Sequence, residues 1–129
     1  MRKFTPFVFL MLATALLISA CGKASDPAAK AVEDYLSALV NKDASAISSL
    51  SCADWESDAL LELDSLQAVT TRLENLACTT SSTDETSTQV NCQGKIIATY
   101  NNENQELDLS VRTYQVVQQG GEYLVCGYK

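Results

Sequence analysis

The five cysteines are the residues of this 129-residue sequence whose chemistry depends most directly on spacing. Cys21 stands near the start, and the other four follow far downstream at Cys52, Cys78, Cys92 and Cys126. None of the intervals forms a C-x-x-C pair, which argues against a structural zinc site. If Cys21 has a separate role, the other four predict two disulfides, which can be connected in three ways. Such bridges persist in oxidising compartments outside the cytoplasm.

The first 21 residues indicate what that separate role is. The chain begins with Met1-Arg2-Lys3 and continues with residues 4–18, which are mostly apolar and carry no charge. A basic start followed by an apolar core is typical of a bacterial export signal. The end of this segment, Ile18-Ser19-Ala20-Cys21, resembles the lipobox of bacterial lipoproteins. The resemblance implies that Cys21 carries a diacylglyceryl group, with acyl chains such as palmitate, and becomes the first residue after cleavage.

This interpretation divides the chain into three parts. Residues 1–20 are the predicted lipoprotein signal peptide, residues 21–26 a lipidated tether, and residues 27–129 a single domain. The alternative is an uncleaved membrane anchor, because residues 4–20 nearly reach the length of about 17 residues that a spanning helix needs. Both readings place the domain on the extracytoplasmic face of the cell membrane or envelope.

The charge balance excludes some classes of partner. The whole chain has a formal net charge of −7, and loss of Arg2 and Lys3 with the signal leaves −9. No cluster of basic residues occurs in the remainder. This argues against nucleic-acid binding and against electrostatic attachment to anionic lipid, both of which need Lys and Arg. We therefore expect the lipid anchor to make the membrane contact, since two acyl chains suffice for stable anchoring.

Hydrophobic periodicity predicts helices in the first half of the domain and strands in the second. Asp26 and Pro27 form a helix start, with Asp as N-cap and Pro at the first position. The expected helices are residues 27–40, 44–50 and 53–68, and the expected antiparallel strands are residues 71–80, 88–100, 106–118 and 122–128. Two to three helices packed on a four-stranded sheet define an α+β fold.

Alternation along the strands favours one disulfide pairing. With the first hairpin centred near Glu85, Cys78 lies opposite Cys92, and Cys52 is left to bridge to Cys126. One face of the sheet is then apolar and the other mainly polar. The polar face also carries an apolar patch, which is either a partner surface or ordinary cross-strand pairing: Ile97, Tyr114, Val116, Tyr123 and Val125.

Residues 31–50, AVEDYLSALVNKDASAISSL, resemble the opening of the nuclear-transport-factor-2-like superfamily, which includes SnoaL-like and ketosteroid-isomerase-like proteins. The shared pattern is an amphipathic helix, a polar break at Asn41-Lys42-Asp43, and a second helix opening with small residues. The resemblance implies a sheet curved around the helices into a cone with a cavity. Tyr35, Trp55 and Tyr100 are the candidates to line this cavity, and the alternative for each is a place in the hydrophobic core. The alternative is another small α+β sandwich with cystatin-like wrapping.

The residues needed for most catalytic chemistry are missing. The sequence contains no histidine, which removes the commonest general base and metal ligand. A ketosteroid-isomerase-like enzyme would need a carboxylate in the cavity, and none falls on the predicted apolar face. The acidic run from Asp54 to Asp58 lacks the glycine and distal glutamate of a calcium loop, since Ala59 and Ser65 stand there. We expect no catalytic residues, no metal and no cofactor.

These observations favour a lipid-anchored, non-enzymatic domain at the cell envelope that binds a protein partner or a small apolar ligand. One alternative is a small enzyme of the ketosteroid-isomerase or SnoaL-like type that uses a buried carboxylate. A third reading is a purely structural accessory of the envelope.

Overall fold

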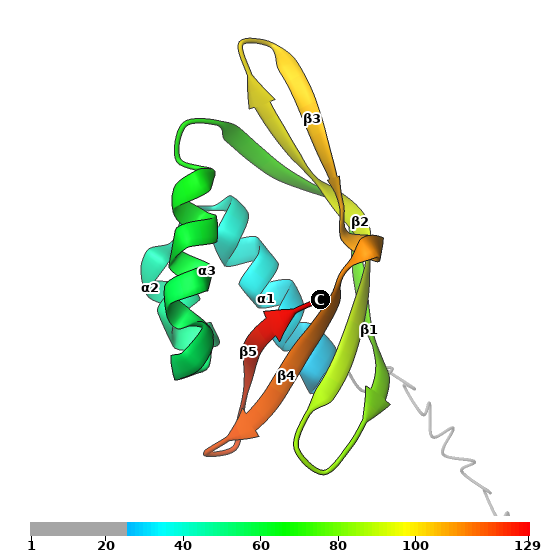
Figure 1. Cartoon of the computed structure of the whole chain (residues 1–129). Helices are drawn as coiled ribbons and strands as arrows, with labels where there is room; N and C mark the ends of the chain where they lie inside the picture. Colours follow the sequence, from blue (N-terminus) through cyan, green and yellow to red (C-terminus); the bar gives the residue numbers. More distant parts are fainter. Residues whose placement is uncertain (1–25) are drawn as a thin grey trace, which may run out of the picture.

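The computed structural model describes residues 26–129, in which three helices cover one face of an antiparallel sheet (Figure 1). The predicted α+β class is confirmed, but the sheet has five strands, not four. The predicted signal peptide and the lipidated Cys21 lie outside the described residues. The elements are α1 (Pro27–Val40), α2 (Ala44–Leu50), α3 (Ala53–Ser65), β1 (Thr70–Thr83), β2 (Thr88–Tyr100), β3 (Glu103–Asp108), the 3-10 turn η1 (Leu109–Val111), β4 (Thr113–Gln119) and β5 (Glu122–Tyr128).

The extra strand arises because the predicted strand 106–118 is interrupted by η1. The Asp108 side chain accepts a hydrogen bond of 2.9 Å from the Ser110 N–H, which closes the turn, and Leu109 enters the core with no exposed surface. The strand order is β1-β2-β4-β5, and β3 also pairs with β2. The long strand β2 therefore pairs with β4 through residues 88–91 and with β3 through residues 95–100.

Because η1 interrupts the strand, residues of β4 and β5 that were expected on the outer face of the sheet lie on its inner face instead. Tyr114, Val116 and Val125 belong to the hydrophobic core, with exposed fractions of 1% or less. Alternation along strand 106–118 predicts Val111 on the apolar inner face, but in the structure it is 71% exposed in the turn. The predicted outer-face patch is therefore wrong for its β4 and β5 residues, because η1 and a break in the β4–β5 pairing shift the alternation. Ile97 of β2 stays on the outer face, opposite Arg72 and Glu106.

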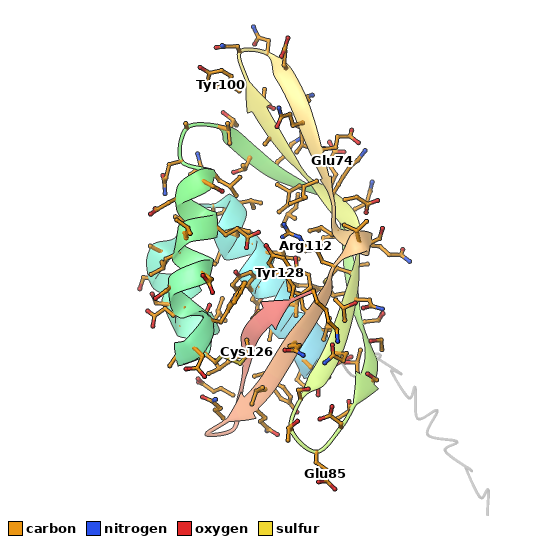
Figure 2. All side chains as sticks on the ribbon, viewed as in Figure 1. Glu74, Glu85, Tyr100, Arg112, Cys126 and Tyr128 are labelled. Carbon is orange, nitrogen blue, oxygen red and sulfur yellow. A yellow bond between two sulfur atoms is a disulfide. The ribbon has the colours of Figure 1, made fainter. Side chains whose placement is uncertain are left out.

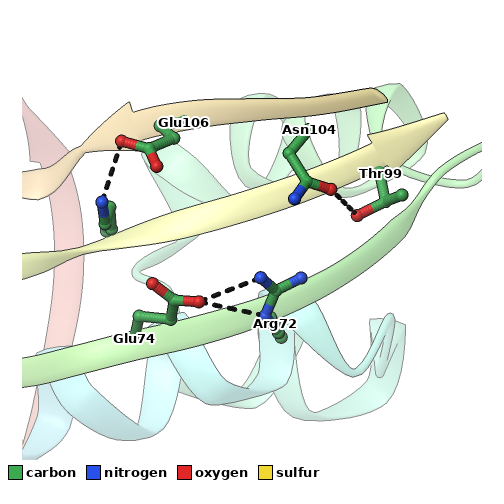
Figure 3. A network of polar contacts seen from close by, with 6 residues as sticks. Arg72, Glu74, Thr99, Asn104 and Glu106 are labelled. Atoms are coloured by element: carbon green, nitrogen blue, oxygen red, sulfur yellow. Dashed lines mark hydrogen bonds and ion pairs between the residues drawn. The ribbon is translucent and has the colours of Figure 1, made fainter. Parts of the chain in front are cut away.

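The outer face of β1, β2 and β3 is polar, as predicted. Figure 3 shows its contacts, in which Arg72 pairs with Glu74 at 2.9 Å and Thr99 donates to Asn104 at 2.7 Å. Lys95 likewise pairs with Glu106 at 2.8 Å. These side chains are exposed, so solvent screens the pairs and they contribute little to stability.

Tight turns set the hairpin registers. Asn101 and Asn102 both have positive φ values, 48° and 63°, which identify a two-residue turn of the primed type. This turn is shorter than the connection 101–105 between the predicted strands. Their pairing predicts Leu107 opposite Ala98, whereas in the structure Leu107 lies opposite Ile96, a difference of two residues in register. A shift of two residues leaves each side chain on its predicted face.

Both predicted disulfides are present. Cys78 and Cys92 are opposite residues of β1 and β2, with their Cα atoms 4.0 Å apart. Cys52, the residue before α3, is bonded to Cys126 of β5 (labelled in Figure 2), and its N–H donates 2.9 Å to the Val125 carbonyl. The first bridge lies within the sheet, whereas the second ties the helical layer to the last strand.

The start of α1 is held by Asp26, as the sequence predicts. Its Oδ1 accepts hydrogen bonds from the N–H groups of Ala28 and Ala29 at 3.1 and 3.3 Å, and its Oδ2 accepts one from the Thr80 N–H at 3.0 Å. One carboxylate thus caps the helix and attaches it to β1. Hydrogen bonding from Thr80, followed by the bonds from Ala29 and Ala28, lowers the pKa of Asp26 below its ordinary value of 3.8.

We predict that Asp26→Ala lowers the free energy of unfolding by about 1–2 kcal/mol at pH 7, the usual cost of losing an N-cap. Because the folded-state pKa is depressed, this stability is present above pH 3.8 and is lost as the pH falls through the lower folded value. Urea denaturation at pH 7 and pH 3 measures both effects. Asp26→Asn is the control, since it keeps a capping oxygen; a loss as large as that of the alanine variant would show that the Thr80 contact, not the cap, carries the effect.

Candidate functional site

A pocket of about 640 Å³ lies between α3 and the adjoining parts of β2 and β3. Most of its wall is apolar or aromatic, and a smaller set of polar side chains joins it. The lining residues are Leu39, Trp55, Asp58, Leu61, Glu62, Ser65, Leu66, Ile96, Ala98, Gln105, Glu106, Leu107, Arg112 and Tyr128. Its volume falls within the range of about 300–1,000 Å³ that is typical of small-molecule sites.

Helix α3 supplies one wall of this pocket. Ala59 and Leu63 face the core with exposed fractions of 2% or less, which turns Glu62 toward the pocket. Helical spacing in residues 53–68 predicts Leu61 on the apolar face with Leu60, Leu63 and Leu66, but Leu61 is 68% exposed at the pocket wall. Leu107 of β3, 36% exposed, belongs to the opposite wall, so both sides of the opening carry a leucine.

The polar centre of the pocket is an ion pair between Glu62 and Arg112. The Arg112 Nη1 lies 2.8 Å from the Glu62 Oε1, and each side chain is only 16% exposed. The hydroxyl of Tyr128 donates to the same oxygen at 3.4 Å, and that of Tyr35 donates to Oε2 at 3.4 Å. Removal from water makes such a pair costly to break, because either charge alone would be poorly solvated.

Aromatic side chains surround this ion pair. The Arg112 guanidinium lies 4.0 Å from the centre of the Tyr128 ring, a cation–π contact (Figure 2). Tyr128 packs edge to face against Trp55 and Tyr114, with ring centroids 5.5 Å apart in both cases. The Trp55 Nε1 donates to the Tyr35 hydroxyl at 3.3 Å. These contacts fix the geometry of the inner wall.

The three predicted cavity residues have different positions. Trp55 lines the pocket, and Tyr35 is fully buried behind it, in contact with Glu62 and Trp55. Tyr100 does not line this pocket: it is 60% exposed near the tip of the β2–β3 hairpin, which extends beyond the helices (Figures 1 and 2). It shares a face with Ala98, but no helix covers it there.

Sequence reasoning missed Glu62, Arg112 and Tyr128. Glu62 lies in an acidic helix that also carries Asp58 and Asp64, a pattern typical of a solvated face. Alternation along an unbroken strand 106–118 predicts Arg112 on the polar outer face, together with Asp108 and Ser110. Once η1 turns the chain, Arg112 faces the helices instead. No local signal in the sequence indicates this turn beyond the Asp108-x-Ser110 spacing.

Burial changes the titration of the tyrosines here. It raises the pKa of Tyr114 to about 12, and it raises the pKa of Tyr35 further, with help from the negative charge of Glu62. Each raised pKa means that the unfolded chain ionises first, near pH 10. The stability associated with each neutral phenol is therefore complete below pH 10 and is lost as the pH rises toward the folded-state value.

We predict that the free energy of unfolding falls between pH 10 and about pH 12, by roughly 1.4 kcal/mol per pH unit for each such tyrosine. Urea denaturation at pH 9, 10 and 11 measures the slope. Tyr114→Phe should make the slope shallower, and it is a suitable control because it removes the buried hydroxyl while keeping the ring that packs against Tyr35 and Tyr128. An unchanged slope in this variant would contradict the assignment.

Two further properties concern residues 26–129 only. No group of three or more Cys, Asp or Glu side chains in this part of the chain is placed to hold a metal ion. No helix there is long and apolar enough to cross a membrane.

The structure is a three-helix, five-stranded α+β domain with a pocket between its two layers. Comparisons with known proteins show similarity of fold only. No protein-family model matches the sequence, and no curated protein matches it significantly. A solution structure of a SEC-C motif containing protein from Rhodopseudomonas palustris, RPA3114, is similar with a TM-score of 0.52. The match has 10% identity and covers 77% of this chain and 74% of that one, so it concerns the fold alone.

A second solved structure, whose name begins Rd1NTF2_05, aligns with a TM-score of 0.46 and 10% identity. The alignment covers 78% of this chain and 92% of the other. At this score the likeness carries no argument.

Proposed function

We propose that this protein is a lipid-anchored, extracytoplasmic domain that binds a small, mainly apolar ligand in the pocket between α3 and the sheet. The observation that carries the proposal is the pocket itself. It is large enough for a small molecule, its wall is mainly apolar, and a few polar groups converge within it, which is the usual composition of a ligand site. The proposed cone of the nuclear-transport-factor-2-like superfamily would place its cavity in the same position, between helices and curved sheet.

The anchor and the compartment belong to the same proposal. The lipobox-like sequence ending at Cys21 supports lipidation, and the two disulfides agree with an oxidising compartment. An anchored domain of this kind holds its pocket close to the membrane surface. A protein partner has less support than a small ligand, because the predicted outer patch that motivated it belongs mostly to the core.

If the protein were instead a small enzyme, Glu62 would be the carboxylate of the pocket available to act as its general base. A general base must approach the proton that it removes to within about 3 Å, with a lone pair directed at it. In Glu62, Oε1 already accepts from Arg112 and Tyr128, and Oε2 accepts from Tyr35. An oxygen pair held by these donors is better suited to fixing Arg112 than to receiving a substrate proton. We therefore retain binding, not catalysis, as the proposed function.

The first experiment is the intact mass of the protein extracted from its own membrane, under native and then denaturing conditions. The proposal expects a chain that starts at Cys21, carries a diacylglyceryl group and lacks four hydrogens because of its two disulfides. It also expects an extra mass that leaves on denaturation. An unmodified or uncleaved chain would refute the anchor, and a native mass without an adduct would count against a retained ligand.

A variant that fills the pocket tests the site directly. We predict that Ala98→Phe lowers the affinity for the released ligand by about tenfold or more, because a phenyl ring would occupy the apolar wall. Trp55 is the single tryptophan of the chain and lines the pocket, so its fluorescence reports occupancy. Thr99→Phe is the matched control, since Thr99 lies on the opposite face of the same strand. Equal binding by both variants would refute the site.

A further inference from the structure

Arg112 has more hydrogen-bond donors than the protein uses. A guanidinium carries five N–H groups. Among residues 26–129 its well-formed hydrogen bond runs from Nη1 to Glu62, while the flat face of the group lies over Tyr128. The hydroxyls of Tyr114 and Tyr128 also interact with the guanidinium, which still leaves some of its five N–H groups without an acceptor. Arg112 lines the pocket and its side chain is only 16% exposed. N–H groups with so little access to water are stabilised by a ligand that brings a hydrogen-bond acceptor into the pocket.

Glu62, in contrast to Arg112, already uses most of its hydrogen-bonding capacity within the domain. Its two oxygens already accept from Arg112, Tyr128 and Tyr35. The ion pair therefore presents unused donors to the pocket and few unused acceptors. Because the two charges cancel at 2.8 Å, the inner end of the pocket is close to neutral although it is rich in donors.

The charges nearby disfavour an ionised ligand group at this point. An anion bound to Arg112 would lie beside the Glu62 carboxylate and would meet a further acidic side chain of the wall, Asp58. A cation at the same depth would lie beside Arg112 and find the oxygens of Glu62 already occupied. A neutral group with an acceptor oxygen avoids both conflicts.

We propose that the pocket binds a neutral amphiphile whose carbonyl or ester oxygen accepts hydrogen bonds from Arg112, while its apolar body lies against the leucine, isoleucine and tryptophan side chains of the wall. This inference rests on the proposed ligand-binding function and adds the chemical class of the ligand. Arg112 recognises the polar group of the ligand by donating hydrogen bonds to it, and Glu62 holds Arg112 in position without itself binding the ligand.

Three probes that share one twelve-carbon chain separate the polar groups: 1-monolauroylglycerol is neutral, laurate is anionic and dodecylammonium is cationic at pH 7. Each is titrated below its aggregation concentration into the full chain held in phosphatidylcholine vesicles, with Trp55 fluorescence as the signal. Ala98→Phe protein in the same vesicles corrects for partitioning into the lipid. We expect monolauroylglycerol to bind about tenfold or more tightly than either charged probe, the size of one hydrogen bond from a charged donor.

The outcomes separate the two proposals. Equal affinity for all three probes would overturn the role of Arg112 and leave the binding function standing. Preference for laurate would overturn the inference by showing that Arg112 attracts an anion. Preference for dodecylammonium would overturn it by showing that the acidic side chains of the pocket wall bind a cation. No fluorescence change with any probe would refute both the inference and the proposed function.

A double variant tests whether the ion pair causes the preference. Glu62→Leu with Arg112→Leu removes both charges together, which leaves no unpaired charge to unfold the domain. We expect this protein to bind the glycerol ester and the fatty acid with affinities within a few-fold of each other. A preference of tenfold that persisted in the double variant would contradict the assignment to Arg112. The three-probe comparison on the natural sequence stands even if this variant fails to fold.

Discussion

Replacing Cys52 and Cys126 with alanine should lower the free energy of unfolding by about 4–5 kcal/mol, the largest effect expected of any change in this domain. The bridge joins residues 74 apart in sequence, so it removes much of the conformational freedom of the unfolded chain. It also holds the start of α3 against β5, where the Cys52 N–H bonds to Val125. Urea denaturation of the oxidised natural protein and of the variant measures the difference.

The matched control is the double alanine variant at Cys78 and Cys92. That bridge spans 14 residues within one hairpin, so its loss should cost about 3 kcal/mol in the same treatment. It also joins strands already paired on both sides of the bridge, whereas the other links two layers. A control variant less stable than the Cys52 and Cys126 variant would contradict the dependence on loop length.

The parts of the fold that follow from local rules were predictable. Asp26 caps α1 as predicted, and Asp43, in the polar break before the second helix, caps α2. A side-chain oxygen next to a helical stretch satisfies free N–H groups whatever the tertiary context. The Cys78–Cys92 pairing followed from alternation along two strands joined by a short connection. In each case residues close in sequence determine the outcome.

The division of the third predicted strand was not predictable in this way. Residues 106–118 alternate well enough for a single strand, and Leu109 fits an inward position in either arrangement. The strand is broken where the Asp108 side chain accepts a hydrogen bond from the Ser110 N–H and residues 109–111 form the 3-10 turn η1. Since that break reverses the faces of the following residues, one missed turn misplaced Tyr114, Val116 and Arg112 together.

The candidate site was predictable only in part for the same reason. Trp55 could be proposed as a cavity residue because it is the single tryptophan of the chain and the family resemblance implies a cavity. The pairing of Glu62 with Arg112, 50 residues later, depends on how α3 packs against the sheet, and nothing in the local sequence of either residue indicates it. The composition excluded histidine chemistry, but it could not show that a carboxylate lies in the pocket.

The ion pair should also matter for stability, and Arg112→Leu measures how much. The variant leaves the Glu62 carboxylate, 16% exposed, without its cation, so we expect a loss of about 3 kcal/mol in the free energy of unfolding, at the lower end of the cost for a fully buried pair. Lys95→Leu is the control. It breaks a pair of similar length, 2.8 Å, on the exposed outer face, where water solvates the remaining Glu106 and little change is expected.

The double variant at Glu62 and Arg112 distinguishes an isolated buried charge from lost packing. If the unpaired carboxylate causes the loss, adding Glu62→Leu to Arg112→Leu should recover most of it, because leucines can fill a partly apolar wall without a desolvated charge. If the loss instead came from the contact of Arg112 with Tyr128, the second substitution would recover nothing. Suppose that the double variant regains stability and also loses its preference for the neutral probe over the anionic one. The ion pair would then serve ligand recognition in the pocket, because apolar side chains in its place would make the domain equally stable.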